Sequence, residues 1–206
     1  MAIRFHQASK EFHLYNAQIS YIIKILENGQ LGHVYYGKHI TDKNDFGYLV
    51  EYASRDMAPY PFEGNSTFSL EHLKQEYPTF GSGDTRYPAF ELEREDGSRV
   101  VDFKYQGHDI YKGKKALAGL PAVYADSGEA ETLEIYLEDK VNGVRVTLLY
   151  GVLAEADIIT RSAVIENRGE SGVTVGKAAS ACLDFLTGSY DMLSFYGRHT
   201  MERNLQ

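Results

Sequence analysis

The chain has 206 residues, of which 43% are hydrophobic and 24% are charged. These proportions are typical of a globular protein and exclude disordered, collagenous and coiled-coil chains. The 29 Asp and Glu outnumber the 21 Lys and Arg, so the net charge is −8, which argues against nucleic acid and anionic membranes as partners. With 16 Tyr, 10 Phe, 19 Gly and no Trp, the composition suits β-strands joined by tight turns.

The first part of the chain predicts a β-hairpin followed by a long loop. Ile19–Leu26 and Leu31–Tyr36 are rich in β-branched and aromatic residues. Asn28-Gly29 between them is typical of a type I′ turn. The stretch Thr41–Asn65 has no strand pattern, and irregular segments of this length in a compact domain are usually functional or cover something.

The only helical spacing lies in Leu70–Tyr77, with Ser69 as the expected N-cap and Pro78 as the stop. It predicts a helix of at most two turns. A second irregular stretch, Tyr77–Pro88, follows it, and a third is expected at Gly107–Gly128.

Further strand pairs show the alternation of apolar and polar residues that places one face in a core and the other in water. They are Phe90–Glu93 with Val101–Tyr105 across Asp96-Gly97, Thr132–Glu138 with Val144–Tyr150 across Asn142-Gly143, and Ile158–Glu166 with Val173–Val175 across Asn167–Gly169. The connections are too short for the helical crossovers of a parallel sheet. The sequence therefore predicts one all-β domain, a large antiparallel β-sandwich with little helix.

No catalytic machinery is visible in the sequence. The seven His are scattered without metal-binding spacing, and the chain contains no nucleophile elbow and no phosphate-binding loop. We expect no metal, no cofactor and no catalytic residue. Cys182 is the only cysteine, no apolar signal segment opens the chain and no run is long enough to span a membrane, so we expect a cytoplasmic protein.

Two segments suit sugar recognition, because charged groups bind hydroxyls and aromatic rings stack on sugar faces. The first is Tyr48–Asn65, where charged and aromatic residues lie among prolines, and the second is the aromatic and polar run Tyr190–His199. The chain ends at Gln206 without a turn or cap, and we expect the natural chain to continue.

Several collinear segments resemble the N-terminal domain of the bacterial α-galactosidases of glycoside hydrolase family 36. Together they cover nearly the whole chain. They are Leu26–Lys38, Thr67–Pro78, Gly81–Ala89, Gly119–Tyr124, Glu129–Ile135, Ile159–Ala163 and Ser189–Leu193.

The resemblance implies a non-catalytic β-supersandwich domain spanning residues 1–206. It also implies a catalytic (β/α)₈ barrel that follows this domain and is absent from these residues. Parent enzymes of this family remove terminal α-linked galactose from melibiose and raffinose with retention, which requires two carboxyl groups about 5–5.5 Å apart. We expect the chain to be inactive alone.

In tetrameric members of the family, loops of this domain reach the active site of a neighbouring subunit. The family's acidic loop position falls on Ser54, next to Arg55, and Asp56 offers a carboxylate two residues on. The family's Trp position falls on His199. The resemblance thus implies Ser54, Arg55, Asp56 and His199 as substrate-binding residues acting in trans in a homotetramer, with α-galactosides as ligands.

Three interpretations of the role of the domain remain open. The chain is either part of an α-galactosidase, a free-standing galactoside-binding module or a pure oligomerisation scaffold.

The Asp84 and Arg86 pair matches the family motif, and we expect it to support a long loop.

Overall fold

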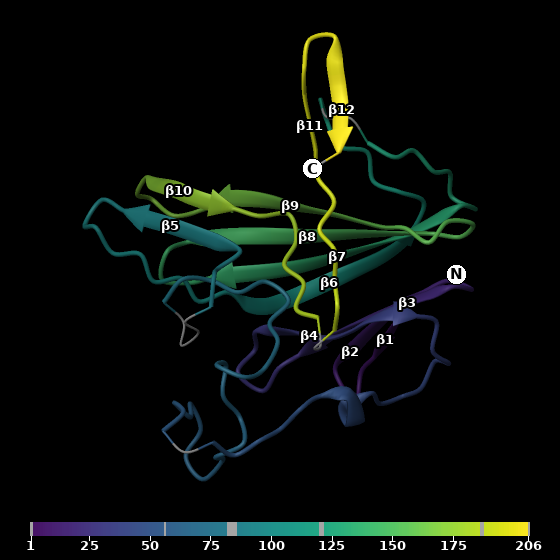
Figure 1. The fold of residues 1–206 in the computed structure, drawn as a ribbon. Helices are drawn as coiled ribbons and strands as arrows, with labels where there is room; N and C mark the ends of the chain where they lie inside the picture. Colours follow the sequence, from purple (N-terminus) through teal and green to yellow (C-terminus); the bar gives the residue numbers. More distant parts are fainter. Residues whose placement is uncertain (1, 56, 82–85, 120–121, 186–187, 206) are drawn as a thin grey trace.

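The computed structural model describes residues 2–55, 57–81, 86–119, 122–185 and 188–205. Two antiparallel four-stranded sheets dominate this part of the chain. The first contains β1 (Ala2–His6), β2 (Glu11–Tyr15), β3 (Ile19–Ile25) and β4 (Leu31–Lys38), and the second contains β6 (Lys104–Lys112), β7 (Ala130–Asp139), β8 (Val144–Leu153) and β9 (Ile159–Asn167). In Figure 1 the first sheet, in purple, lies beneath the second, in green. The predicted all-β sandwich is confirmed.

Two smaller strand pairs complete the fold. β5 (Phe90–Arg94) pairs with β10 (Val173–Ala178), and β11 (Phe195–Arg198) forms a hairpin with β12 (Met201–Leu205). The hairpin stands away from both sheets at the top of Figure 1. Within the described residues the helical content is limited to a 3₁₀ turn at Gly47–Leu49.

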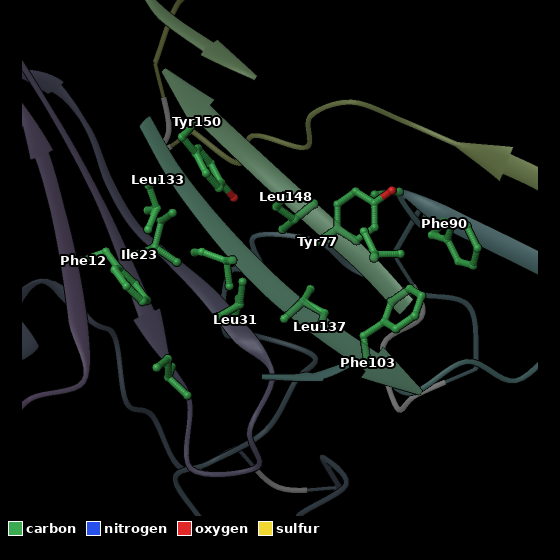
Figure 2. Packing of buried hydrophobic residues seen from close by; sticks show 14 of the residues in the cluster. Phe12, Ile23, Leu31, Tyr77, Phe90, Phe103, Leu133, Leu137, Leu148 and Tyr150 are labelled. Atoms are coloured by element: carbon green, nitrogen blue, oxygen red, sulfur yellow. The ribbon is translucent and has the colours of Figure 1, made fainter. Parts of the chain in front are cut away.

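The core lies between the two sheets. Phe12 and Ile23 from the first sheet face Leu133 and Leu148 from the second, and all four side chains are fully buried. Figure 2 shows how these side chains interdigitate between the sheets. Burying each such side chain contributes about 1.5–3 kcal/mol, so this interface supplies most of the hydrophobic stabilisation.

The outer face of the first sheet is covered by the segment that follows β4. Phe46 is fully buried and packs on the His13 ring, with ring centroids 4.9 Å apart. Its backbone N–H donates to the buried Glu11 carboxylate at 2.8 Å. β2 is consequently buried on both faces, although its sequence alternates polar Glu11 and His13 with apolar Phe12 and Leu14.

The turn between β3 and β4 differs from the predicted type. Only Gly29 has a positive φ, of 82°, whereas a type I′ turn requires positive φ at Asn28 as well. The Gly29 N–H donates to the Leu26 carbonyl at 2.8 Å, and the Leu26 N–H to the Gln30 carbonyl, also at 2.8 Å. This is the longer hairpin loop in which a glycine in the left-handed region forms a bulge.

Two predicted hairpins are wrong, because their strands pair elsewhere. The turn at Asp96-Gly97 forms, with the Gly97 N–H bonded to the Arg94 carbonyl at 2.9 Å. However, β5 pairs with β10, so neither of them pairs with its neighbour in the chain. β9 pairs with β8, and β6 pairs with β7 and extends to Lys112 into the expected loop at 107–128.

The predicted helix at Leu70–Tyr77 is also absent. Ser69 caps one turn, since its carbonyl accepts the Leu73 N–H at 3.2 Å. The chain then forms backbone bonds with β4: the Lys74 carbonyl accepts the His33 N–H and the Glu76 N–H donates to the Leu31 carbonyl, both at 2.9 Å. Pairing with the sheet has replaced the hydrogen bonds of a helix.

Candidate functional site

The loop predicted to contact sugar projects from the first sheet. Val50 and Phe62 pack at its two ends against an apolar cluster that includes Phe68. The residues between them, 51–61, are mostly exposed, and the Met57 side chain is 100% exposed. We call residues 51–61 the site loop. Its ends are fixed by packing while its middle faces solvent.

Two of the predicted residues lie side by side on the site loop. The Ser54 hydroxyl is 3.2 Å from that of Ser66. The Arg55 guanidinium lies 3.7 Å from the Glu51 carboxylate, and both side chains are more than half exposed. The Tyr60 hydroxyl donates to the Arg55 carbonyl, which supports the backbone here. Asp56 lies outside the described residues.

His199 lies at a different place, on the turn between β11 and β12. It is exposed, and so are the large side chains that lead to it, Tyr190, Phe195 and Tyr196. In Figure 1 the hairpin is at the top of the molecule and the site loop is at the bottom. One chain therefore does not bring His199 together with Ser54 and Arg55.

Arg86 has the supporting role expected for it. Its guanidinium donates to the carbonyls of Leu70 at 3.1 Å and Leu73 at 2.6 Å, and to the Asp184 carboxylate at 3.0 Å. It thereby ties the single turn after Ser69 to the C-terminal part of the chain. Asp84 lies outside the described residues.

A buried polar cluster around Glu76 is the main feature that the sequence does not predict. The Glu76 carboxylate accepts hydrogen bonds from the Tyr21 hydroxyl at 2.9 Å and the Tyr150 hydroxyl at 2.8 Å. The Arg161 guanidinium lies 2.9 Å away and His33 Nδ1 3.2 Å away. We call these five residues the Glu76 cluster. They come from β3, β4, the segment before β5, β8 and β9, so the cluster joins the two sheets.

Electrostatics keep the Glu76 carboxyl ionised in this buried position. Burial raises its pKa, but the charge of Arg161 and the hydrogen bonds from His33 and Tyr150 outweigh burial, so the pKa lies below its ordinary value. Burial and the neighbouring carboxylate raise the pKa of Tyr21 and keep that hydroxyl protonated. Glu76 is 0% exposed, so its carboxylate is closed to a substrate and holds the fold together. Tyr21, Tyr150 and Arg161 of the cluster also line a hollow of about 110 Å³.

A second buried group has the connectivity of a catalytic triad. The Ser20 hydroxyl is 2.9 Å from His13 Nε2, and His13 Nδ1 is 2.7 Å from the Asp42 carboxylate. Ser20 and His13 are fully buried, and the Ser20 oxygen accepts the Ile40 N–H at 3.0 Å. A nucleophile must be reachable by its substrate. This group instead fixes the chain at residues 40–42, where the long loop begins.

The described residues contain no group of His, Cys, Asp and Glu that could hold a metal ion. Nor does any helix in this part of the chain have the length and apolarity needed to cross a membrane.

Comparisons with known proteins agree on one family. The model of the glycosyl hydrolase family 36 N-terminal domain matches residues 29–206. The bifunctional α-galactosidase/sucrose kinase AgaSK of Mediterraneibacter gnavus is 45% identical over 100% of this chain and 22% of its own length. α-Galactosidase AgaA of Geobacillus stearothermophilus is 40% identical over 98% of this chain and 28% of its own length.

Solved structures give the same answer. The galactosidase domain of AgaSK superposes with a TM-score of 0.91 at 44% identity, over 100% of this chain and 28% of that one. A doubly substituted variant of AgaA of Geobacillus stearothermophilus in complex with raffinose gives a TM-score of 0.86 at 41% identity, over 96% and 27% of the two chains. The chain thus spans about a quarter of the relatives it matches. Its sequence, sheet topology and overall fold show that it belongs to the N-terminal domain of glycosyl hydrolase family 36.

Proposed function

We propose that this chain is the non-catalytic N-terminal domain of a retaining α-galactosidase that removes terminal α-linked galactose from sugars such as melibiose and raffinose. The relatives support this proposal, since AgaA is an α-galactosidase and has been solved with raffinose. Retention requires two carboxyl groups about 5–5.5 Å apart at the scissile bond. We assign that pair to a catalytic barrel in the remainder of the protein.

We further propose that the domain completes the sugar site of a neighbouring subunit in a homotetramer. The observation that carries this proposal is the separation of the site loop, with Arg55, from the hairpin turn, with His199 (Figure 1). Both are exposed. The two exposed segments lie far apart on one domain. Each can contribute to a sugar site most readily when it extends toward a neighbouring subunit.

A mixing experiment tests the action in trans. Full-length subunits carrying His199→Ala are co-assembled with full-length subunits that lack the catalytic nucleophile, each population being weakly active by itself. If His199 serves a neighbour, hybrid assemblies pair an intact nucleophile with an intact hairpin and regain hydrolysis of a chromogenic α-galactoside. Activity equal to the average of the two parents contradicts the proposal.

The alternatives give different results. A pure oligomerisation scaffold predicts that Arg55→Ala or His199→Ala lowers the oligomeric state and leaves KM of the assembled enzyme unchanged. A free-standing module predicts full galactoside affinity for the 206-residue chain alone. We also propose a cytoplasmic location, which the single cysteine supports because it can form no internal disulfide.

A further inference from the structure

A hollow of about 190 Å³ lies between the first sheet and the base of the site loop. Three segments line it: residues 32–35 of β4, which we call its floor, and residues 49–51 and 72–74, which we call its walls. It is below the roughly 300–1,000 Å³ of sites for drug-sized ligands. Its size therefore suits a single small ring.

The hollow is built on paired backbone and packed side chains. The His33 N–H of the floor donates to the Lys74 carbonyl of the wall at 2.9 Å, and Gly32 bridges to Gln75. Leu26 and Leu73, which both line the hollow, are buried in one apolar cluster. A preformed site of this kind loses little conformational entropy when a ligand binds.

The lining of the hollow combines apolar surface with polar groups of both kinds. Val34 and Tyr35 supply apolar and aromatic surface, while Glu51 and Lys74 supply a hydrogen-bond acceptor and a donor. His72 Nε2 is 3.4 Å from the Thr67 carbonyl, and the buried Nδ1 has no hydrogen-bond partner among the described residues. Buried polar atoms are normally satisfied, so an unsatisfied one in a wall requires an explanation.

An anion, a wholly apolar ligand and a sugar ring fit this lining to different degrees. An anion such as phosphate meets the Glu51 carboxylate and a chain of net charge −8, and a wholly apolar ligand leaves Glu51 and Lys74 without new partners. A sugar ring has an apolar face for Tyr35 and hydroxyls that both donate and accept. The lining matches it at each of these points.

We propose that this hollow binds one pyranose ring of an α-galactoside, as a sugar site additional to the contacts assigned to Arg55 and His199. The choice of galactoside rests on the proposed function. Glu51 lines the hollow and also lies 3.7 Å from the Arg55 guanidinium. A bound ring therefore competes with Arg55 for Glu51 and links the hollow to the site loop.

The test is an NMR titration of the 206-residue chain with methyl α-galactopyranoside, following the imidazole signals. We expect saturable shifts of the His72 signals, and at least about fivefold weaker binding for Lys74→Met, which removes a charged hydrogen-bond donor. Lys140→Met is the matched control at an exposed position outside the hollow, and it should bind like wild type. His72→Phe, which keeps a ring, is a second variant and should also weaken binding.

Three outcomes contradict the proposed sugar site, and a fourth contradicts only the proposed action in trans. No saturable shift at millimolar sugar contradicts it, and so does a Lys74→Met variant that binds like wild type. Shifts confined to His199 also contradict the hollow but leave the proposed function intact. Conversely, a failed subunit-mixing experiment together with saturable binding at His72 contradicts action in trans and leaves the hollow intact.

Discussion

Two carboxylate–guanidinium pairs in this molecule share their chemistry and differ in their surroundings. Glu76 and Arg161 are 2.9 Å apart, with side chains 0% and 8% exposed. Glu51 and Arg55 are 3.7 Å apart, with side chains 71% and 57% exposed. Solvent screens the second pair and hardly screens the first. Removing one member of the buried pair should therefore destabilise the sandwich, whereas the exposed pair is free to exchange its partners for a ligand.

The largest effect expected from this comparison is that of Arg161→Met. The substitution leaves the buried Glu76 carboxylate without its cation, which should lower the free energy of unfolding by about 3–5 kcal/mol. Urea unfolding followed by circular dichroism measures it. Arg168→Met is the control, because that guanidinium pairs with Glu166 on the surface. If the two variants are equally stable, the Glu76–Arg161 pair does not stabilise the fold as argued.

Removing one neutral hydrogen-bond donor from the Glu76 cluster should lower the free energy of unfolding by less than Arg161→Met does. Tyr150→Phe deletes the hydroxyl that donates to Glu76 at 2.8 Å, and a hydrogen bond to a charged group contributes about 1.5–3 kcal/mol. The same unfolding experiment applies, with Tyr124→Phe as the control at an 83% exposed position. A Tyr150→Phe variant as stable as this control would show that the remaining donors satisfy Glu76.

Lowering the pH should weaken the Glu76–Arg161 pair and lower the free energy of unfolding. The pKa of Glu76 lies below its ordinary value of 4.5 in the folded state. Its ionisation therefore contributes fully to stability above that value, and the contribution is lost as pH falls through the folded-state pKa. The slope for one proton is at most about 1.4 kcal/mol per pH unit. Unfolding measured from neutral pH to below 4.5 should show a shallower decline for Glu76→Gln than for wild type, and identical slopes would contradict the assignment.

The smallest change in stability is expected at the exposed pair. Arg55→Ala should change the free energy of unfolding by less than about 0.5 kcal/mol, because surface ion pairs contribute little. In the full-length enzyme the same substitution should raise KM for an α-galactoside. A loss of stability comparable to that of Arg161→Met would instead assign Arg55 to the fold.

The parts of the fold that follow from local sequence are those with local partners. The strand pairs β3–β4 and β7–β8 were predictable because strand-forming residues and an Asn-Gly sequence lie within about 20 residues, and because apolar and polar residues alternate in β7 and β8. The partner of β5 was not, since Val173–Arg94 and the pairs beyond it join segments about 80 residues apart. A turn such as Asp96-Gly97 reverses the chain without deciding which strand it will join.

The site shows the same limit. The segments that hold Ser54, Arg55 and His199 were predictable as candidates from their charged, aromatic and proline residues, and all three residues are exposed. The Glu76 cluster was not, because Glu76 and Arg161 are 85 positions apart and nothing local marks a carboxylate that will be buried. The only signal for the cluster in the sequence was an acidic residue at the end of a predicted helix. That helix does not form, because its segment pairs with the first sheet.

The pairing of β5 with β10 has a consequence for how the protein forms. The strand at Phe90–Arg94 bonds through Phe90 to the nearby residues 78–80, but its strand partner exists only once residues 173–178 have been made. The Tyr77 hydroxyl likewise bonds to the Ala179 carbonyl only after that residue has been made. Contacts so distant in sequence slow folding and leave apolar surface open in the meantime. On the ribosome, the early hairpins must therefore remain soluble as an incomplete sandwich while the second half of the domain is synthesised.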